Sequence, residues 1–349
     1  MKIALDISRL NPAALKRGVG FYALNLSKAL STLNDGNQYL LLTKKTDING
    51  FDLIHYPYFD PFFLTLPIIK KLPTVVTVHD LTPIKFSQHY PQGVKGSLKW
   101  QIQRLSLKSV NHVITDSLNS KNDLNKVLNI NDNKISVIYL AADKEFTQIN
   151  NQVKFKEIRE KFRLKGKFLL YVGDVNWNKN VLSLLKAFAF NRKENKELKL
   201  VLVGSAFENN KLMEVKKIDE FIRRNKLETS IIKTGFIDDK DLAVLYNMST
   251  LYIQPSFYEG FGLSVLEALS CGCPVLSSNK ASLPEVGGKS VAYFNPDEKN
   301  GLDINLSKLL ADKKRLENLS KLGIKQARKF NWEQTAINTR EVYKKIFKK

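Results

Sequence analysis

Two carboxylates and two glycines in the stretch from Pro255 to Pro274 have a spacing that suits a ligand with both an anion and sugar hydroxyls. Glu259 and Glu267 are eight residues apart, and Gly260 and Gly262 follow the first of them. The apolar run that comes next predicts a helix, so the glycines form a loop at its start. Backbone N–H groups there, together with the helix dipole, favour an anion such as a diphosphate. A carboxylate beside that anion suits sugar hydroxyls.

A purely structural interpretation of the same residues stays open. Glu259 can be a solvated loop residue, and Glu267 can be an acidic residue that the dipole favours in the first turns of the helix. The spacing alone does not separate these alternatives. Strand-like runs at Thr250–Gln254 and Val275–Ser278 predict a strand–loop–helix–strand unit that would position both carboxylates.

Strand-like and helical runs alternate along the whole chain, which is the βαβ rhythm of doubly wound parallel sheets. With 349 residues the chain is too long for one ordinary core and suits two α/β domains. We place these domains at residues 1–150 and 151–332, with the linker in the polar stretch from Asp143 to Lys167. The expected strands are Ile3–Ile7, Gln38–Thr43, Leu53–Tyr58, Thr74–His79, His112–Asp116, Lys134–Leu140, Phe168–Val172, Lys199–Gly204, Ser230–Thr234, Leu251–Gln254 and Val275–Ser278, and the expected helices include Phe21–Leu33, Ser97–Ser109 and Trp332–Phe347.

Composition places the chain among globular proteins. Its hydrophobic content is 43% and its charged content is 26%, both typical of a domain that folds in water. No apolar run approaches the roughly 18 residues that a membrane span needs. Residues 2–8 are typical of a first strand rather than of a signal peptide. We therefore expect a cytoplasmic protein.

The net charge of +21 suits either a polyanionic partner or simple solubility. The segment from Lys308 onward alone has 13 basic and 4 acidic residues. The sequence has no helix-turn-helix, zinc-finger or aromatic-rich RNA-binding motif, so we expect no specific nucleic-acid partner. An anionic substrate or an anionic membrane surface is favoured instead. The basic stretch Ser97–Ser109, with Lys99, Arg104 and Lys108, is the candidate lipid contact, and an ordinary amphipathic core helix is the alternative.

We expect no metal site. Cys271 and Cys273 are the only cysteines, and two ligands do not make a structural zinc site unaided. Small apolar residues that fill a turn after a helix are the preferred interpretation. Asp239 and Asp241 match a D-x-D metal motif, but apolar residues at helical spacing follow them. We therefore expect Asp238 or Asp239 to cap a helix.

The segment around the two glutamates resembles the E-x7-E signature of the family 4 (group 1) retaining glycosyltransferases. The matching residues are Glu259-Gly-Phe-Gly-Leu-Ser-Val-Leu-Glu267, with Ser282-Leu-Pro-Glu-Val286 further along, and Ser264 stands where the family commonly has Pro. The resemblance implies the GT-B fold, in which two Rossmann-like doubly wound domains face a central cleft. It also implies that a C-terminal helix, residues 333–349, crosses back onto the first domain.

The resemblance implies that the second domain binds the nucleotide sugar. The stretch Tyr171–Asn180 looks like the family's loop in which an Arg and a Lys hold the diphosphate, and Lys179 falls on the lysine position. Asn178 or Asp174 stands where the arginine is usually found, and Lys lacks the planar fork of Arg. A solvated surface lysine is the alternative for Lys179. The implied substrate-binding residues of this domain are Gly173, Lys179, Phe236, Gly260, Phe261, Gly262, Leu263 and Glu267, and its implied catalytic residue is Glu259.

Two places in the first domain match the family less strongly. The run Lys16–Gly20 lies between the first strand and the first helix, where Gly18 and Gly20 would let a ligand approach the carboxyl edge of the sheet. A plain tight turn is the alternative. His79 and Asp80 follow an apolar strand, and the family places a histidine there against the transferred sugar. We expect His79 to be catalytic and Asp80 to bind substrate, although a satisfied strand-end histidine is the alternative.

The string His79-Asp-Leu-Thr-Pro is similar to a branch that contains many mannosyltransferases. The resemblance therefore implies a metal-independent, retaining transfer of a hexose from a nucleotide-diphosphate donor to a glycan or a lipid-linked acceptor, without a cofactor. GDP-mannose is the first expected donor and UDP-glucose the second. The rival interpretations are a sugar-nucleotide epimerase or a phosphorylase, a nucleic-acid-binding protein, and a non-catalytic module that binds nucleotide sugars or polyanions. Reversible attachment to the inner membrane surface is also expected.

Overall fold

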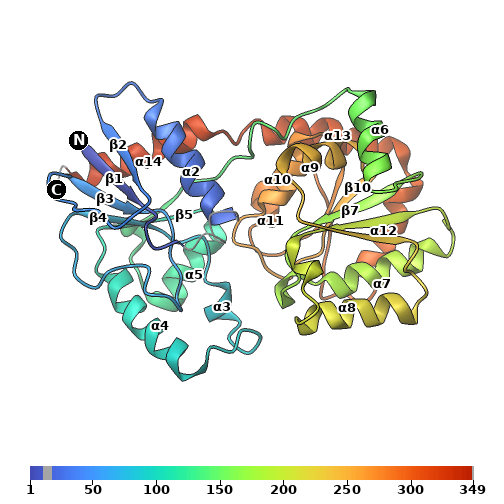
Figure 1. Ribbon diagram of the computed structural model, residues 1–349, viewed down its shortest axis with the longest axis horizontal. Coiled ribbons are helices and arrows are strands. Elements are labelled where there is room, and N and C mark those ends of the chain that lie inside the picture. The colour runs from blue at the N-terminus through green and yellow to red at the C-terminus, as the bar shows by residue number, and fades with distance from the viewer. Residues whose placement is uncertain (11–17, 348–349) are drawn as a thin grey trace. The chain divides into compact units, whose positions relative to one another are not determined.

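The computed structural model describes residues 1–10 and 18–347, which fold into two compact units (Figure 1). One unit combines residues 1–141 with 330–349, and the other comprises residues 142–329. Each unit contains a six-stranded sheet in which every described strand pair is parallel. The chain is therefore an α/β protein with two doubly wound sheets, as its alternating pattern predicts.

The sheet of the first unit has the strand order β2-β1-β3-β4-β5-β6. Because the order changes direction next to β1, helices must cross over both faces of this sheet. The strands are β1 (Lys2–Asp6), β2 (Gln38–Leu42), β3 (Leu53–Tyr56), β4 (Thr74–Thr77), β5 (His112–Thr115) and β6 (Ile135–Val137), and the helices are α2 (Gly18–Ser31), α3 (Thr82–Lys85), α4 (Gly93–Lys108), α5 (Leu118–Leu128) and α14 (Trp332–Phe347).

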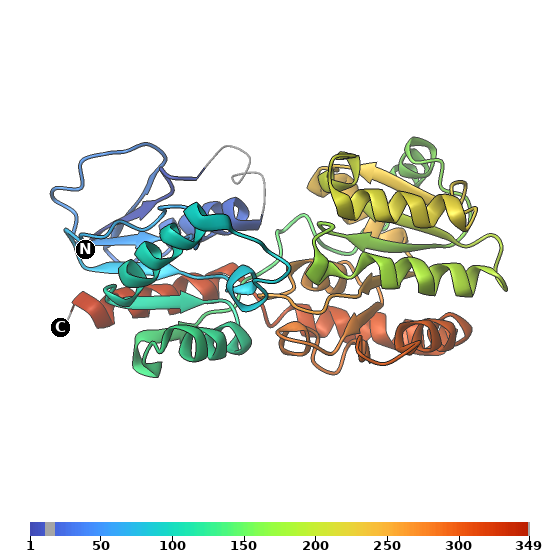
Figure 2. The ribbon, with the colours of Figure 1, turned by 90° about the horizontal axis from the view of Figure 1, so that it is seen from below.

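Alternate residues of these strands pack against different helices, as the pleat of a strand requires. Ile54 and Val76 join the cluster that α4 and α5 complete (in front of the strands in Figure 2). The adjacent His55 contacts the opposite layer, where its ring Nδ1 lies 2.6 Å from the Tyr343 hydroxyl of α14. The C-terminal helix α14 therefore belongs to the first unit, where it also packs against α2 (Figure 1).

The sheet of the second unit has the order β12-β11-β10-β7-β8-β9. Helices α7, α8 and α12 cover one face, and α9 and α10 cover the other (Figure 1). Helix α13 packs against α10 and α12. The strands are β7 (Phe168–Val172), β8 (Lys199–Val203), β9 (Ile231–Gly235), β10 (Leu251–Gln254), β11 (Val275–Ser278) and β12 (Ala292–Phe294), and the helices are α6 (Gln152–Lys161), α7 (Val181–Arg192), α8 (Met213–Arg224), α9 (Asp239–Met248), α10 (Leu263–Ser270), α11 (Leu283–Gly287), α12 (Gly301–Ala311) and α13 (Lys313–Ala327).

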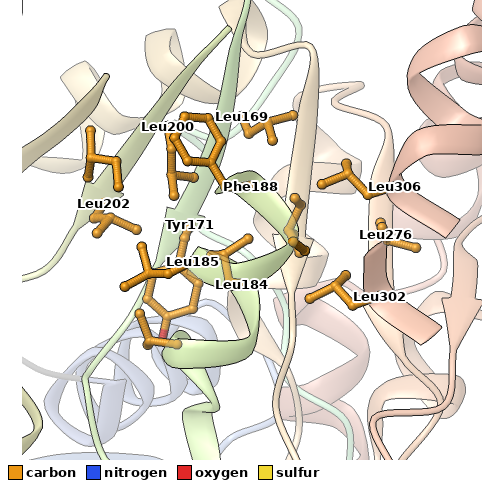
Figure 3. Packing of buried hydrophobic residues seen from close by; sticks show 14 of the residues in the cluster. Leu169, Tyr171, Leu184, Leu185, Phe188, Leu200, Leu202, Leu276, Leu302 and Leu306 are labelled. Carbon is orange, nitrogen blue, oxygen red and sulfur yellow. The ribbon is translucent and has the colours of Figure 1, made fainter. Parts of the chain in front are cut away.

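Figure 3 shows the core between this sheet and its helices. Leu169 and Leu200 point from neighbouring strands toward Phe188 of α7, and Leu302 and Leu306 reach the same core from α12. The spacing of four residues on α12 puts both leucines on one face of the helix. This packed core holds the carboxyl ends of the strands in place, where the candidate site lies.

Several boundaries differ from the expectations. Helix α2 begins at Gly18 instead of Phe21, and α4 begins at Gly93 instead of Ser97. The stretch from Asp143 to Lys167, expected to hold the linker, belongs to the second unit and contains α6. Strand β12 was not anticipated, because its three residues are too short to give an alternating pattern. Among the residues described, no helix is long and apolar enough to cross a membrane.

Candidate active site

A glycine loop at the start of α10 forms the centre of the candidate site. Residues 255–262 connect β10 to α10, and Gly262 precedes the first helical residue with φ of 109°. A Cβ at Gly262 would lie 3.0 Å from Leu283 Cδ2, so both the conformation and the space favour glycine. The Ser282 hydroxyl shares its one proton between two carbonyl oxygens of the loop, which lie 2.9 and 2.8 Å from Oγ. The loop is thus fixed where the first N–H groups of α10 have no acceptor within their own helix.

The carboxylate of Glu259 accepts hydrogen bonds from three side chains. Lys179 Nζ lies 2.9 Å from Oε1 and 2.8 Å from Oε2. Gln254 Nε2 and Ser256 Oγ donate to Oε1 at 2.8 and 2.7 Å. Glu259 is buried, and Lys179 is mostly buried too. Lys179 is therefore not the solvated surface lysine that the alternative interpretation offered, and Glu259 is not a solvated loop residue.

The two positions where the family's arginine was sought have structural roles. Asn178 is buried, and its Nδ2 donates to the Tyr258 carbonyl at 2.9 Å, while its own carbonyl accepts from the Phe257 N–H at 2.8 Å. Asn178 thus fastens the loop after β7 to the loop after β10. Asp174 accepts from the Val175 N–H at 2.7 Å. Neither position supplies a cation, so Lys179 is the cationic side chain of this loop.

Glu267 lies on α10 in a buried environment. Its Oε2 accepts a hydrogen bond from the Tyr246 hydroxyl at 3.1 Å. Burial raises the pKa of Glu267 to about 8, and the nearby carboxylates of Asp239 and Asp143 act in the same direction, whereas the hydrogen bond from Tyr246 opposes them. A carboxyl group of this kind can donate or accept a hydrogen bond near neutral pH. It is suited to paired hydroxyls such as those of a ribose.

The remaining predicted residues of this unit lie at the carboxyl edge of the same sheet. Gly173 follows β7 and donates its N–H to the Val203 carbonyl at 3.0 Å. Gly204 follows β8 and lies close to Gly173. A Cβ at Gly204 would be 2.1 Å from the Gly173 oxygen. Phe236 follows β9 and is 67% exposed. Because the strands are parallel, these loops emerge on one side together with the loop after β10.

In the first unit, His79 lies just after β4 and pairs with a carboxylate. Its Nδ1 is 2.5 Å from Asp116 Oδ2, which lies just after β5. Burial alone would lower the pKa of His79, but the charge of Asp116 and its hydrogen bond outweigh burial and raise this pKa. Asp116 therefore favours the imidazolium form of His79.

Asp80 has a local structural role, and the two early glycines lie in a helix. Asp80 Oδ1 accepts from the Thr82 N–H at 2.8 Å at the start of α3. Gly18 and Gly20 lie in the first turn of α2, and not in a loop before it as the sequence suggested. Lys16 and Arg17 of the same run lie outside the described residues.

Asp238 caps α9, because its side chain accepts from the Asp241 N–H at 3.0 Å. This observation confirms the expected cap, and Asp241 is engaged by Lys161 at 2.5 Å. Both cysteines are buried. In the part of the chain that the structure describes, no three His, Cys, Asp or Glu side chains come together as a group that could hold a metal ion.

Sequence reasoning missed four partners: Asp116, Tyr246, Gln254 and Ser256. Asp116 and Gln254 each lie at the end of a predicted strand, so the rule that ligands bind at the carboxyl ends of parallel strands could have singled out both. Tyr246 reads as one apolar position of α9, and Ser256 as a loop residue. No pattern in the sequence indicates the contacts of these two residues. Tyr246 contacts Glu267, which is 21 residues away, and the contact of Ser256 with Glu259 depends on the conformation of the loop.

Two family models match the chain. The model described as Glycosyl transferases group 1 matches residues 153–326, and the model described as Glycosyltransferase Family 4 matches residues 12–146. The first match lies within the second unit, and the second match covers most of residues 1–141 of the first unit and ends at residue 146, just inside the second.

Similar proteins include two mannosyltransferases. O-antigen chain mannosyltransferase B from Escherichia coli is 28% identical over 296 residues, which are 84% of this chain and 75% of that protein. Serotype-specific mannosyltransferase WbdA from Escherichia coli is 28% identical over 265 residues, which are 75% of this chain. The matched residues are 32% of WbdA, so the chain spans about a third of the length of that relative.

Similar solved structures cover nearly the whole chain. Sucrose-phosphate synthase from Thermosynechococcus elongatus has a TM-score of 0.77 at 22% identity, over 99% of both chains. Anabaena Alr3699/HepE in complex with UDP-glucose has a TM-score of 0.76 at 17% identity, over 99% of this chain and 100% of that chain. At these identities the similarity shows the shared two-domain fold.

Proposed function

Because this chain belongs to the family 4 (group 1) glycosyltransferases and has the GT-B fold, we propose that it transfers mannose from GDP-mannose to a hydroxyl of a glycan or lipid-linked acceptor. We propose that the anomeric configuration is retained. The observation that supports mannose is the similarity to O-antigen chain mannosyltransferase B over 84% of the chain. UDP-glucose is the second candidate donor, since a structural neighbour was solved in complex with it.

The reaction builds negative charge on the departing diphosphate and positive charge on the sugar. The N–H groups around Gly262 and Leu263 and the Lys179 ammonium are suited to hold the leaving phosphate. Glu267 would bind the ribose hydroxyls of the donor. His79 and Glu259 would position the transferred sugar. Oε2 of Glu259 accepts only from Lys179 in the described chain, which leaves lone pairs for a sugar hydroxyl.

No side chain is assigned as a covalent nucleophile in this proposal. The acceptor hydroxyl would attack the anomeric carbon from the face that the diphosphate leaves, and the donor phosphate oxygen would take the proton. We further propose that the transfer is independent of metal ions, because Lys179 and the start of α10 already provide positive charge for the diphosphate.

The proposal is tested by a thermal-shift screen of nucleotide sugars, followed by transfer assays with the donors that bind. GDP-mannose is expected to raise the melting temperature most, since a ligand that binds only the folded state stabilises it by mass action. Transfer with this donor should persist in the presence of a chelator. Stabilisation only by UDP-glucose would reassign the donor, and donor binding without transfer would indicate a non-catalytic module. Activity that is lost with chelator and restored by magnesium would contradict metal independence.

One surface of the first unit suits an anionic membrane. Exposed apolar side chains lie along one stripe of α4 and on the loop between β3 and β4. Lysines flank them, of which Lys95 and Lys108 are exposed and Lys99 is partly exposed. The apolar residues are Val94, Leu98 and Leu105 of the helix and Phe63, Leu64, Ile68 and Ile69 of the loop, and the cations include Lys95, Lys99 and Lys108. We call these residues the α4 surface. Such a combination of apolar and basic groups suits the boundary between headgroups and acyl chains.

The α4 surface leads us to propose reversible attachment to anionic bilayers, which would bring the enzyme to a lipid-linked acceptor. Lys99 Nζ lies 5.3 Å from the centre of the Phe63 ring, so the basic and apolar groups are in contact. Arg104, which the sequence suggested as a further contact, is only partly exposed and its Nε is buried. The test therefore uses Lys95 in its place.

Replacing Lys95, Lys99 and Lys108 by Gln is expected to release the protein from anionic vesicles. Each lysine near such a surface contributes about 1 kcal/mol, so the triple variant should bind roughly a hundredfold more weakly at low salt. Co-sedimentation with anionic and neutral vesicles measures the effect. The matched control replaces the exposed Lys314, Lys321 and Lys325 of α13 by Gln, with the same loss of charge. Equal recovery of both triple variants, or of the unmodified protein with either vesicle, would contradict the proposal.

A further inference from the structure

A buried carboxylate, Asp116, lies behind the histidine that we place near the transferred sugar. Asp116 is 2% exposed, and its Oδ2 is 2.5 Å from His79 Nδ1. The two residues follow neighbouring parallel strands, β4 and β5, whose registers pair Thr77 with Ile114. The contact therefore depends on the sheet and does not require a flexible loop to close.

The imidazole ring of His79 is also fixed from its other side. The Tyr22 ring of α2 meets it edge to face, with centroids 4.8 Å apart and planes at 88°. The Tyr22 hydroxyl lies 3.0 Å from Thr77 Oγ1, and Thr77 Oγ1 in turn lies 2.8 Å from His55 Nε2. Tyr22 is thus held by a polar chain within the unit. Packing on one side and a carboxylate on the other leave the ring little freedom to rotate.

Two polar atoms of the pair remain unsatisfied. His79 Nε2 and Asp116 Oδ1 are buried, and neither makes a hydrogen bond of ordinary geometry with a residue that the structure describes. The Pro57 carbonyl interacts with the imidazole, but it has the smallest of the effects on the His79 pKa. Buried polar atoms are almost always paired, because an unpaired one loses its hydration without compensation. A pair with a purely structural role would be expected to satisfy both atoms. Hydroxyl groups of a bound sugar could satisfy both.

We propose that Asp116 is a positioning residue for the transfer reaction: it accepts the Nδ1–H of His79 and so turns Nε2 toward a hydroxyl of the donor sugar. This inference rests on the proposed function, and it adds a residue that the sequence signatures do not include. The arrangement fixes which ring nitrogen faces the ligand, because Nδ1 is already engaged. Asp116 need not touch the ligand to do so.

The charges around His79 support this role. Burial opposes the imidazolium form of His79. The charge and hydrogen bond of Asp116, with smaller effects of Asp80 and the Pro57 carbonyl, outweigh burial and raise the pKa of His79. His55, the other histidine of the polar chain, is fully buried, and burial followed by the charge of His79 lowers its pKa to about 3. Burial likewise raises the pKa of Tyr22, so both neighbours stay neutral near pH 7. Of His79, His55 and Tyr22, only His79 is therefore expected to change its charge when Asp116 is replaced.

The test combines a titration and kinetics of Asp116→Asn. Asparagine has the same shape and can still accept from Nδ1–H, but it removes the charge. In the unmodified protein the NMR signal of His79, identified among the four histidines by its loss in His79→Gln, should titrate above the ordinary pKa of about 6.5. In Asp116→Asn that pKa should fall by at least about one unit. The value of kcat should fall about 10- to 100-fold with KM changed less than about threefold, and the alkaline limb of the pH–kcat profile should move to lower pH.

The matched control is Asp123→Asn. Asp123 is also buried in this unit and pairs with a cation, Lys85 Nζ, at 2.7 Å. This control should leave the His79 titration and the position of the pH profile unchanged. The proposal is overturned if His79 of the unmodified protein titrates at or below 6.5, if Asp116→Asn leaves its pKa unchanged, or if the control shifts the pH profile equally. The titration needs no substrate, so a protein without transfer activity would overturn the proposed function and still give a result for the pair.

Discussion

Replacing Lys179 by Gln is expected to weaken donor binding by about 10- to 100-fold. The substitution removes the ammonium that we place against the diphosphate, and a hydrogen bond to a charged group contributes about 1.5–3 kcal/mol. Isothermal titration calorimetry with the donor identified in the screen measures this change. Because Asn178 and Asp174 bring no cation to the same loop, no neighbouring side chain of that loop can replace Lys179.

The same substitution should also destabilise the second unit. Lys179 Nζ contacts both carboxylate oxygens of the buried Glu259, and removal of one partner of a buried ion pair leaves an uncompensated charge that costs about 3 kcal/mol or more. The double variant Lys179→Gln/Glu259→Gln removes both charges. It should recover most of the free energy of unfolding but not the donor affinity. A double-mutant cycle in urea and in donor titrations separates the two effects.

Lys233→Gln is the control for these measurements, because Lys233 pairs with Asp219 at 2.7 Å on the surface of the same unit. Loss of such an exposed pair typically costs less than about 1 kcal/mol. Donor affinity should be unchanged in this control. If Lys179→Gln binds the donor as tightly as the control does, Lys179 has only a structural role with Glu259 and the proposed diphosphate site is wrong.

Glu267→Gln is expected to abolish a pH dependence of donor binding. Burial raises the pKa of Glu267 to about 8, whereas paired ribose hydroxyls are best accepted by the ionised carboxylate. Donor binding should therefore release a proton below pH 8, and affinity should rise up to about tenfold per pH unit between pH 6 and 8. In Glu267→Gln the affinity should be about 10- to 100-fold lower at pH 8 and nearly constant with pH. Intact nucleotide sugar is the appropriate probe, since it lacks a phosphate monoester that titrates near pH 6.

The stability of the ligand-free protein gives an independent check with a defined sign. The folded-state pKa of Glu267 lies above its ordinary value of 4.5, so the folded state holds a proton that the unfolded chain releases. The stabilisation from this group is complete below about pH 4.5 and is lost as pH rises through about 8. Between these limits the free energy of unfolding should fall by about 1.4 kcal/mol per pH unit from this group alone. Glu267→Gln should flatten the curve by that amount, and an unchanged slope would show that Glu267 is ionised in the folded state.

Glu259→Ala should separate the two glutamates functionally. Glu259 lies in the loop and Glu267 lies on the helix. We therefore expect the loss of the Glu259 carboxylate to lower kcat more than donor affinity, in contrast to the loss of Glu267. Ligand-free stability will also fall, because the alanine leaves the Gln254 and Ser256 donors without their acceptor. The comparison with Glu259→Gln, which keeps an acceptor, distinguishes the lost carboxylate from the lost hydrogen bonds.

The sequence by itself determined the features that depend on neighbouring residues. Alternation of apolar runs predicts the parallel strands, and the bounds of β7 and β11 agree with the expectation. The glycine loop before α10 and the cap at Asp238 are also local, because a helix start is decided by a few consecutive residues. The position of Lys179 in its loop follows from the same kind of local pattern.

Only the tertiary structure decided what each functional side chain contacts. Lys179 and Glu259 are 80 residues apart, and His79 and Asp116 are 37 residues apart. These pairs form because parallel strands bring the loops at their carboxyl ends to one edge, and the order of the strands selects which loops meet. The burial that raises the pKa of Glu267 likewise comes from helices packed around α10. Residue spacing along the chain contains neither the strand order nor the depth of burial, so the charge states of this site follow from the fold.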